Sequence, residues 1–237
     1  MTWSEWKKKQ ESALDEYRSP DYFTRWDQAR REFGTFCNDS GRTLDVGAGM
    51  SRLPWQYVQG PNIDLVGLDP LDGGHREYPF VRAVGEFMPF RQEVFDAVIC
   101  ASVLDHLINP ATVLQEIQPI LKPQGNLFVW SGIYSTPLDE ARREAISYMK
   151  ESTRLLRDAF KKRDLRHFKD SAYYAMCCAQ TIAAISLGRR HQIEDPHHFT
   201  RFSARSVVAL IGKSGYSISS IRPYENSVMV RASKKKR

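Results

Sequence analysis

The chain has 237 residues, of which 42% are hydrophobic and 11% aromatic, so it is long enough to bury a substantial core. Its net charge of +6 permits anionic partners without requiring one. Four cysteines without a Cys-x-x-Cys pair argue against a disulfide framework and a zinc site, and we expect no bound metal.

The amino-terminal segment predicts two helices over residues 3–36, which form a helical cap spanning residues 1–38. Pro20 separates the two apolar stripes at a plausible helix start. The first eight residues lack the apolar centre of a signal peptide, and no apolar run approaches the roughly 20 residues that span a bilayer. These features lead us to expect a cytoplasmic protein without a membrane span.

Residues 43–51 predict a strand, a tight turn and the start of a helix. Gly47 and Gly49 follow an apolar run, and without a Cβ they let the backbone turn sharply beside a ligand. Asp45 falls at the carboxyl end of this strand, the edge at which parallel α/β sheets bind ligands. A lone Gly-x-Gly pattern also occurs in ordinary strand-to-helix turns.

Three further apolar runs follow at the spacing of successive strands. The second ends at Asp69, about 20 residues after the first, the separation typical of an acid that reaches ribose hydroxyls. The third leads into Glu86-Phe87-Met88-Pro89-Phe90. The fourth, residues 95–101, opens into Ser102-Val103-Leu104-Asp105-His106.

These motifs, in this order, resemble the class I S-adenosylmethionine-dependent methyltransferases, particularly the ubiquinone-biosynthesis-like branch. The resemblance covers roughly residues 40–135 well. It implies a Rossmann-like α/β fold with a seven-stranded, mostly parallel sheet and an antiparallel last strand. It also implies S-adenosylmethionine as the cofactor, held by a core over residues 42–135 of a single domain spanning 1–237.

The carboxyl-terminal part adds a helical insertion to this fold. Residues 137–190 predict two helices between the fifth and sixth strands, either as a solvated charged face or as a lid over the substrate. Residues 200–234 then predict a helix capped by Ser203 and stopped by Gly215, followed by two strands. The four basic residues at the end predict a frayed tail.

The resemblance assigns cofactor contacts along the sheet edge. It implies main-chain contacts around the first turn, an ammonium acceptor and a ribose acceptor there, and further contacts after the third and fourth strands; the residues are Asp45, Gly47, Ala48, Gly49, Asp69, Pro70, Gly85, Glu86, Ala101 and Ser102. Val84 departs from the pattern, because the family places an acid there that accepts from the adenine amino group. Glu86 is an alternative acceptor for that group.

His106 is the candidate general base, because it follows the fourth strand and has a side chain that titrates near neutral pH. Asp105 is the neighbouring alternative, while a structural role for His106 remains open. Methyl transfer from a reactive sulfonium needs mainly alignment, so a dedicated base is not required.

The substrate side is expected to use segments outside the core. By resemblance, Tyr22, Phe23 and Trp26 wall the pocket, although packing of the cap on the core is the alternative. His197 and His198 lie in a stretch that closes the substrate side in related enzymes, and their spacing matches no zinc site.

We therefore predict a methyltransferase acting on oxygen or nitrogen of a small biosynthetic molecule. The fourth strand lacks the Asn/Asp-Pro-Pro-Tyr and Pro-Cys signatures of base-methylating enzymes, which makes a nucleic acid an unlikely partner. The alternatives are a methyltransferase for RNA or another polyanion, suggested by the basic insertion, and a non-catalytic cofactor-binding module, suggested by Val84. The oligomeric state stays open.

Overall fold

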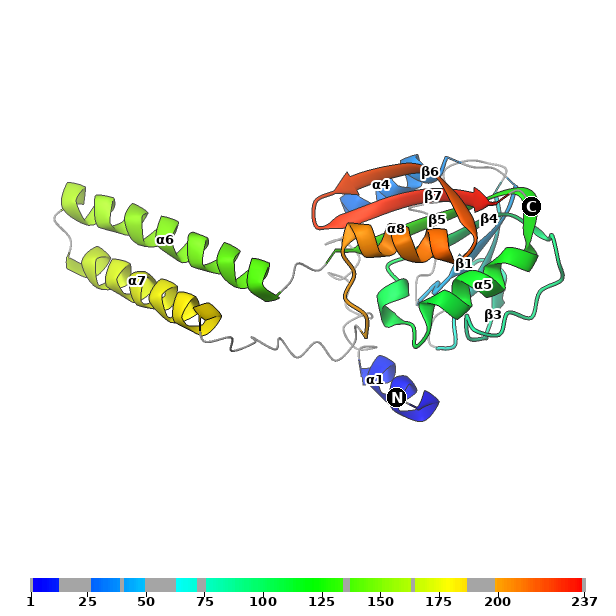
Figure 1. The fold of residues 1–237 in the computed structure, drawn as a ribbon, viewed down its shortest axis with the longest axis horizontal. Coiled ribbons are helices and arrows are strands. Elements are labelled where there is room, and N and C mark those ends of the chain that lie inside the picture. Colours follow the sequence, from blue (N-terminus) through cyan, green and yellow to red (C-terminus); the bar gives the residue numbers. More distant parts are fainter. Residues whose placement is uncertain are drawn as a thin grey trace. The chain divides into compact units, whose positions relative to one another are not determined.

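The computed structural model describes residues 2–12, 27–38, 41–49, 63–71, 76–133, 137–162, 165–186 and 199–235. Two compact units are present (Figure 1): Met1–Tyr134 with Asp195–Arg237 form the first, and Ser135–Glu194 form the second. The second unit corresponds closely to the helical insertion predicted over 137–190. The prediction that the whole chain works as one domain stays a prediction.

The first unit is built on a seven-stranded sheet with the order β3-β2-β1-β4-β5-β7-β6. Its strands are β1 (Gly41–Val46), β2 (Ile63–Leu68), β3 (Phe80–Val81), β4 (Phe95–Ala101), β5 (Leu121–Gly132), β6 (Tyr216–Tyr224) and β7 (Ser227–Lys234). Strands β1 to β5 run parallel, whereas β7 is antiparallel to both of its neighbours. The predicted Rossmann-like sheet with an antiparallel last strand is therefore confirmed.

Helices cover both faces of this sheet. The helical elements of the first unit are α1 (Trp3–Ser12), α4 (Asp27–Cys37), the short 3-10 helix η1 (Leu104–His106), α5 (Pro110–Ile120) and α8 (Ala204–Lys213). The Asn109 side chain caps α5 by accepting from the Thr112 amide at 3.2 Å. Ser203 caps α8 as predicted, accepting from the Ser206 amide at 3.1 Å.

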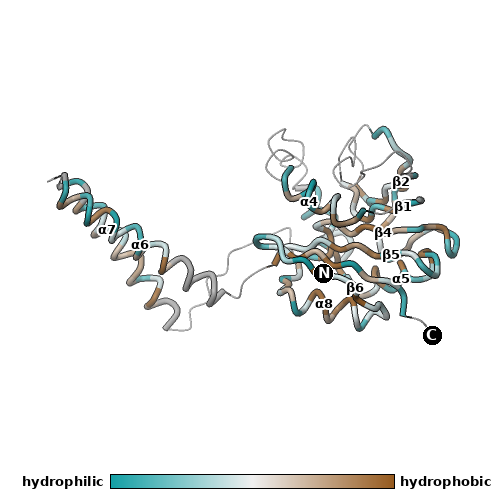
Figure 2. Tube along the Cα trace, turned by 90° about the horizontal axis from the view of Figure 1, so that it is seen from above, coloured by the Kyte–Doolittle hydropathy of each residue, from teal (hydrophilic) through white to brown (hydrophobic). Residues whose placement is uncertain are grey.

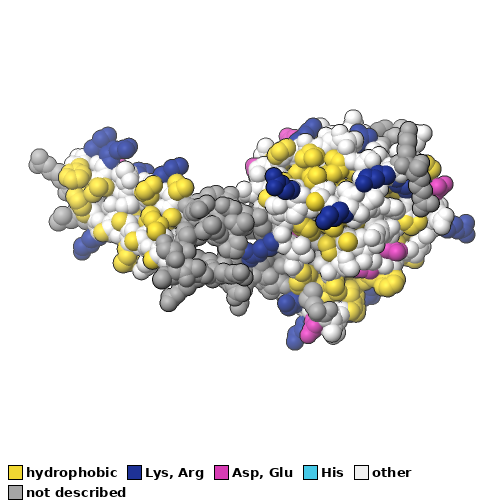
Figure 3. Space-filling model, in the orientation of Figure 1, with side chains coloured by type: hydrophobic (Ala, Val, Ile, Leu, Met, Phe, Trp, Pro, Cys, Tyr) yellow, Lys and Arg dark blue, Asp and Glu magenta, His cyan; other side chains and the backbone are white. Residues whose placement is uncertain are grey.

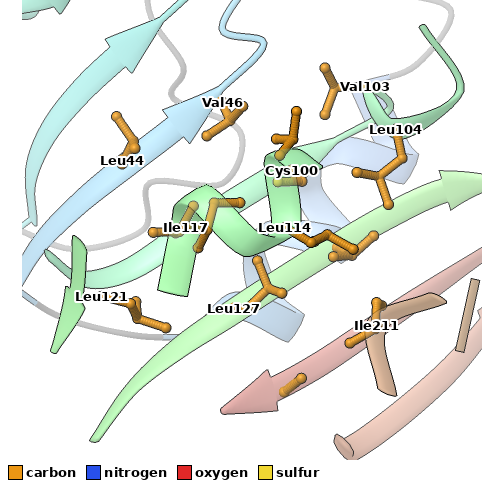
Figure 4. Close-up of a cluster of buried hydrophobic side chains, with 14 of the residues drawn as sticks. Leu44, Val46, Cys100, Val103, Leu104, Leu114, Ile117, Leu121, Leu127 and Ile211 are labelled. Atoms are coloured by element: carbon orange, nitrogen blue, oxygen red, sulfur yellow. The ribbon is translucent and has the colours of Figure 1, made fainter. Parts of the chain in front are cut away.

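Two hydrophobic clusters lie on opposite faces of the sheet. The larger joins Leu114 of α5 and Ile211 of α8 to residues of the strands such as Leu44 and Leu127, and Figure 4 shows this packing. The smaller joins α4 to the other face through Phe33, which is fully buried. Burying each of these side chains contributes about 1.5–3 kcal/mol, so both faces anchor the strands that carry the site.

Strand β5 differs from its prediction. The sequence predicts a turn over 122–126, yet β5 begins at Leu121 and continues to Gly132. Its pairing with β4 jumps from Phe95↔Leu121 to Ala97↔Asn126, so the proline and glycine between them are absorbed in an irregularity of the strand. The predicted separate turn is therefore wrong.

The second unit is a pair of antiparallel helices, α6 (Pro137–Lys162) and α7 (Leu165–Ser186), as the sequence predicts (Figure 2). The two helices are joined by hydrogen bonds in which the Ser152 hydroxyl donates to the Ser171 carbonyl, and the Ser171 hydroxyl to the Ser152 carbonyl, both at 2.9 Å. Across the described ranges, no helix combines the length and apolar character needed to cross a membrane.

Candidate functional site

Polar side chains gather where the parallel strands of the first unit end. Asp45 lies near the end of β1, opposite Gly67 of β2 and Ile99 of β4. Asp69 directly follows β2, and Ser102 directly follows β4. This edge is where open parallel α/β sheets bind their ligands, and it contains the predicted cofactor residues.

The turn after β1 has the backbone shape that its glycines predict. The amides of Gly47 and Ala48 donate to the Leu68 carbonyl at 2.8 and 3.2 Å, which ties the turn to β2. Gly47 has a φ of +77°, and a Cβ there would overlap the Val103 side chain. Gly49 also has a positive φ, of +60°, but among the described residues a Cβ there would meet only the Gly47 carbonyl, at 4.0 Å, so these residues leave its main chain approachable.

Asp69 braces this turn with both carboxylate oxygens. Its Oδ2 accepts from the Gly49 amide at 3.0 Å, and its Oδ1 accepts from the Leu71 amide at 2.8 Å. Burial raises the pKa of Asp69, and these two hydrogen bonds oppose that rise. Each oxygen has a second lone pair, so the carboxylate can hold the turn and still accept from a ligand.

Asp45 lies in a different environment, because nothing among the described residues hydrogen-bonds to its carboxylate. The residue is 1% exposed, and both oxygens are buried without a hydrogen-bond partner in the described part of the chain. Burial, together with the nearby charge of Asp69, raises the pKa of Asp45 to about 7, and Arg30 opposes this. A buried carboxylate of this kind is costly unless a ligand donates to it, which favours a cationic ligand group.

Two residues that the sequence analysis missed pack against this turn. The Arg76 Nη2 donates to the Gly49 carbonyl at 2.6 Å, and its guanidinium lies 3.6 Å from the centre of the Phe80 ring. Tyr78 packs on Gly67, where a Cβ would come within 2.6 Å of its ring. Glycine inside a buried strand marks such a close approach, so Gly67 was the available signal.

The remaining predicted cofactor residues lie at the ends of β3 and β4. Ser102 follows Ala101 with a φ of +52°, and its amide donates to the Trp130 carbonyl at 2.7 Å. A positive φ at a residue other than glycine stores strain, and such strain concentrates at functional sites. Gly85 is buried and Glu86 half-buried in the turn after β3, next to Phe87, which is 78% exposed.

The turn η1, which carries Asp105 and His106, is held by two segments distant in sequence. The Trp6 indole of α1 donates to the His106 carbonyl at 2.7 Å. The amides of Phe199 and Thr200 donate to the Asp105 carbonyl at 2.7 and 3.2 Å. The structure therefore brings the amino-terminal cap and the segment before α8 to the same turn.

The side chains of η1 differ in exposure. The Asp105 side chain is 1% exposed and that of His106 is 16% exposed. Their closest atoms, Oδ1 and Nε2, are 4.0 Å apart, which is beyond hydrogen-bond length. Other predicted substrate residues, namely Tyr22, Phe23, Trp26, His197 and His198, lie outside the described residues.

Comparisons with known proteins agree on this region of the chain. Residues 44–129 match a family model described as a methyltransferase domain. A ubiquinone biosynthesis O-methyltransferase of Xylella fastidiosa strain 9a5c is 29% identical over 99 residues, covering 37% of this chain and 40% of that protein. A rat thiol S-methyltransferase is 41% identical over 102 residues, covering 38% and 42%. The matched stretch thus spans about 40% of the length of the first of these relatives.

Solved structures extend the likeness over the fold. A Burkholderia thailandensis 1,6-didemethyltoxoflavin-N1-methyltransferase, solved with its substrate and S-adenosylhomocysteine, superposes with a TM-score of 0.62 at 11% identity. The superposition covers 98% of this chain and 88% of that one. At this identity the likeness concerns the fold alone.

Proposed function

Because the core of this chain is a class I S-adenosylmethionine-dependent methyltransferase domain, we propose that the protein transfers a methyl group to oxygen or nitrogen of a small molecule. The names of two relatives support a small-molecule acceptor: one is a methyltransferase of ubiquinone biosynthesis and one is a thiol methyltransferase. The acceptor of this chain is proposed only as a class.

The observation that carries the proposal is the pair of buried carboxylates beside the glycine turn. Asp45 offers two buried acceptor oxygens to an ammonium group, and Asp69 offers the remaining lone pairs of a braced carboxylate to a vicinal diol. S-adenosylmethionine carries both groups, so the residues present fit it. When bound, this cofactor supplies an electrophilic methyl group on a sulfonium.

The adenine end would be held by the turn after β3. Val84 supplies no carboxylate there, so Glu86 is our candidate for the adenine amino group. Phe87, which is 78% exposed beside it, offers a ring face for stacking. Ala101 and Ser102 would lie against the cofactor from the end of β4, and Pro70 would do so from the end of β2.

On the acceptor side, we assign His106 as the proton acceptor when the substrate is a hydroxyl or an ammonium group. Its partly exposed ring follows β4 at the binding edge, and the more buried Asp105 is the alternative proton acceptor. The hydrogen bonds from Trp6 and Phe199 fix the main chain of this turn and thereby orient both side chains.

The cofactor site is tested by calorimetric titration of S-adenosylmethionine and S-adenosylhomocysteine into the pure protein. The variant Asp69→Asn removes one carboxylate oxygen and should weaken both ligands at least tenfold. The matched control is Asp64→Asn on the same strand, an exposed carboxylate 3.5 Å from the Arg42 guanidinium, which should bind as the wild type does. No binding by the wild type would refute the cofactor assignment.

The acceptor class is tested with radiolabelled cofactor and four groups of acceptors: phenols, amines, thiols and structured RNA. Transfer to a phenol or an amine is the expected result. Transfer to RNA alone, falling steeply with salt, would support the polyanion alternative instead. Cofactor binding without transfer to any class would favour the non-catalytic alternative.

A further inference from the structure

The second unit buries its small side chains and exposes its large ones. Where α6 and α7 meet, the described buried residues are Ala145, Leu155, Ala159, Ser171 and Thr181, of which only leucine is a large aliphatic residue. Helices normally place their largest apolar side chains against a partner. Among the described side chains, this pair therefore has a small core, and several of its larger apolar residues are exposed.

The exposed apolar residues of α6 form a regular stripe, called here the large stripe. It recurs at alternating intervals of three and four residues and consists of Ile146, Met149, Thr153, Leu156 and Phe160. Met149 is 54% exposed and Phe160 is 69% exposed. The 3.5-residue repeat is typical of helices that pack along their whole length against other helices.

A second stripe on α7 has the same repeat but smaller residues, and is called the small stripe. It consists of Phe168, Ala172, Ala175, Ala179 and Ile182, all exposed. Each stripe residue comes directly after a position that faces the other helix. Because the two helices are antiparallel, this offset places both stripes on the same side of the hairpin. The Phe160 and Phe168 rings, 5.2 Å apart, join the stripes at the tip of the hairpin.

Together the stripes make one exposed apolar face, whereas the opposite side of α6 is polar. There Arg154 pairs with Glu151 and with Asp158, in contacts suited to solvent. Figure 3 shows hydrophobic side chains exposed on this unit, with basic side chains at their border. The stripe side of α6 is thus apolar and its opposite side is polar, whereas α7 also exposes Tyr173 and Met176 outside its stripe.

We propose that this face binds the same face of a second copy of the chain, so that two hairpins form a four-helix bundle. The two stripes are self-complementary, because 146–160 and 168–182 have equal lengths and pair large side chains with alanines. A two-fold axis along the helices places the large stripe of each copy on the small stripe of the other and keeps neighbouring helices antiparallel. The hairpin then gains the core that it lacks alone.

The test measures the mass of the full-length protein by analytical ultracentrifugation between about 1 and 100 µM. The wild type should reach twice the 27.3 kDa of one chain. A double variant of the large stripe, Met149→Glu with Leu156→Glu, should remain monomeric, and so should a double variant of the small stripe, Ala172→Lys with Ala175→Lys. The matched control is Ser147→Glu, an exposed position of α6 outside the stripe, which should dimerise.

Mixing the two monomeric variants should restore a dimer, because one interface then pairs glutamates with lysines. That rescue also shows that both variants are folded, which circular dichroism checks independently. A wild type that stays monomeric at 100 µM overturns the proposal. It does so even if that monomer sediments with anionic lipid vesicles, because the face would then bind a lipid surface instead of a second copy. A dimer that persists in both stripe variants overturns it as well, because another surface must then hold the copies together.

Discussion

Asp45 offers the sharpest test of the site, through the substitution Asp45→Asn. This change keeps the shape of the side chain and removes its charge. Because burial raises the pKa of Asp45 from 3.8 to about 7, ionisation of this carboxyl opposes folding. An acid with a raised pKa is already ionised in the unfolded chain but still protonated in the folded one between pH 4 and 7, so stability falls across this window as the pH rises.

The magnitude follows from the size of the pKa shift. Each unit corresponds to about 1.4 kcal/mol, so raising the pH from 5 to beyond 7 should cost the wild type about 3 kcal/mol that the asparagine variant does not lose. The variant should therefore gain stability relative to the wild type between pH 5 and pH 8. The polar groups of the buried asparagine amide change the free energy of unfolding of the variant by the same amount at pH 5 and at pH 8. Their contribution therefore cancels when the two pH values are compared.

The assay is urea unfolding at pH 5 and pH 8, followed by tryptophan fluorescence. All five tryptophans belong to the first unit, so the signal reports on the unit that contains Asp45. The exposed Asp64→Asn serves as the control and should show no such difference. A stability difference between Asp45→Asn and wild type that does not change with pH would refute the reasoning.

The same substitution should have the opposite effect on the cofactor. An ammonium beside Asp45 lowers the pKa of this carboxyl, so binding to the wild type at pH 6 should release a proton. Titrations in buffers of different ionisation enthalpy measure that release. Asp45→Asn should bind more weakly and release no proton from this site, although its stability relative to the wild type increases between pH 5 and pH 8.

Three further substitutions test the surroundings of the site. Gly47→Ala should destabilise the protein by about 3 kcal/mol or more in urea unfolding, because both the positive φ and the Val103 side chain oppose a Cβ there. Gly49→Ala, where the described residues leave room for a Cβ, should cost about 1 kcal/mol. Equal costs for the two substitutions would contradict this reasoning. Arg76→Met should raise the cofactor Kd about tenfold by releasing the Gly49 carbonyl, which calorimetry measures. Trp6→Phe, which loses the bond to the His106 carbonyl, should raise the acceptor KM several-fold and leave the cofactor Kd unchanged; a change confined to the cofactor Kd would argue against that role.

The glycine turn and its carboxylate were predictable because their signals are local. Asp45, Gly47 and Gly49 lie within five residues, and their strand, turn and carboxylate follow from apolar runs and glycine chemistry. The cap at Ser203 is local in the same way, and the helix after it begins where Ser203 predicts. Short-range sterics and hydrogen bonding decide such features, so one sequence is enough to find them.

Contacts between distant residues were less predictable. No periodicity relates Trp6 to His106, 100 residues later, or Arg76 to the Gly49 carbonyl. Strand β5 likewise contains a proline and a glycine that locally favour a turn, yet it continues past them through an irregularity and pairs with β4 and β7 from Asn126 onward. Tertiary packing determines these long-range contacts and the course of β5, and local sequence patterns indicate such packing only indirectly.

The anchoring of η1 has a consequence for how such proteins diversify. The stretch that matches the methyltransferase family, residues 44–129, contains the glycine turn and both buried carboxylates, while Trp6 and Phe199 lie outside it. Substitutions in those outlying segments can shift the His106 turn without touching either buried carboxylate. If the proposed function holds, selection can therefore change the methyl acceptor while the methyl donor stays the same, and engineering can treat the two segments separately.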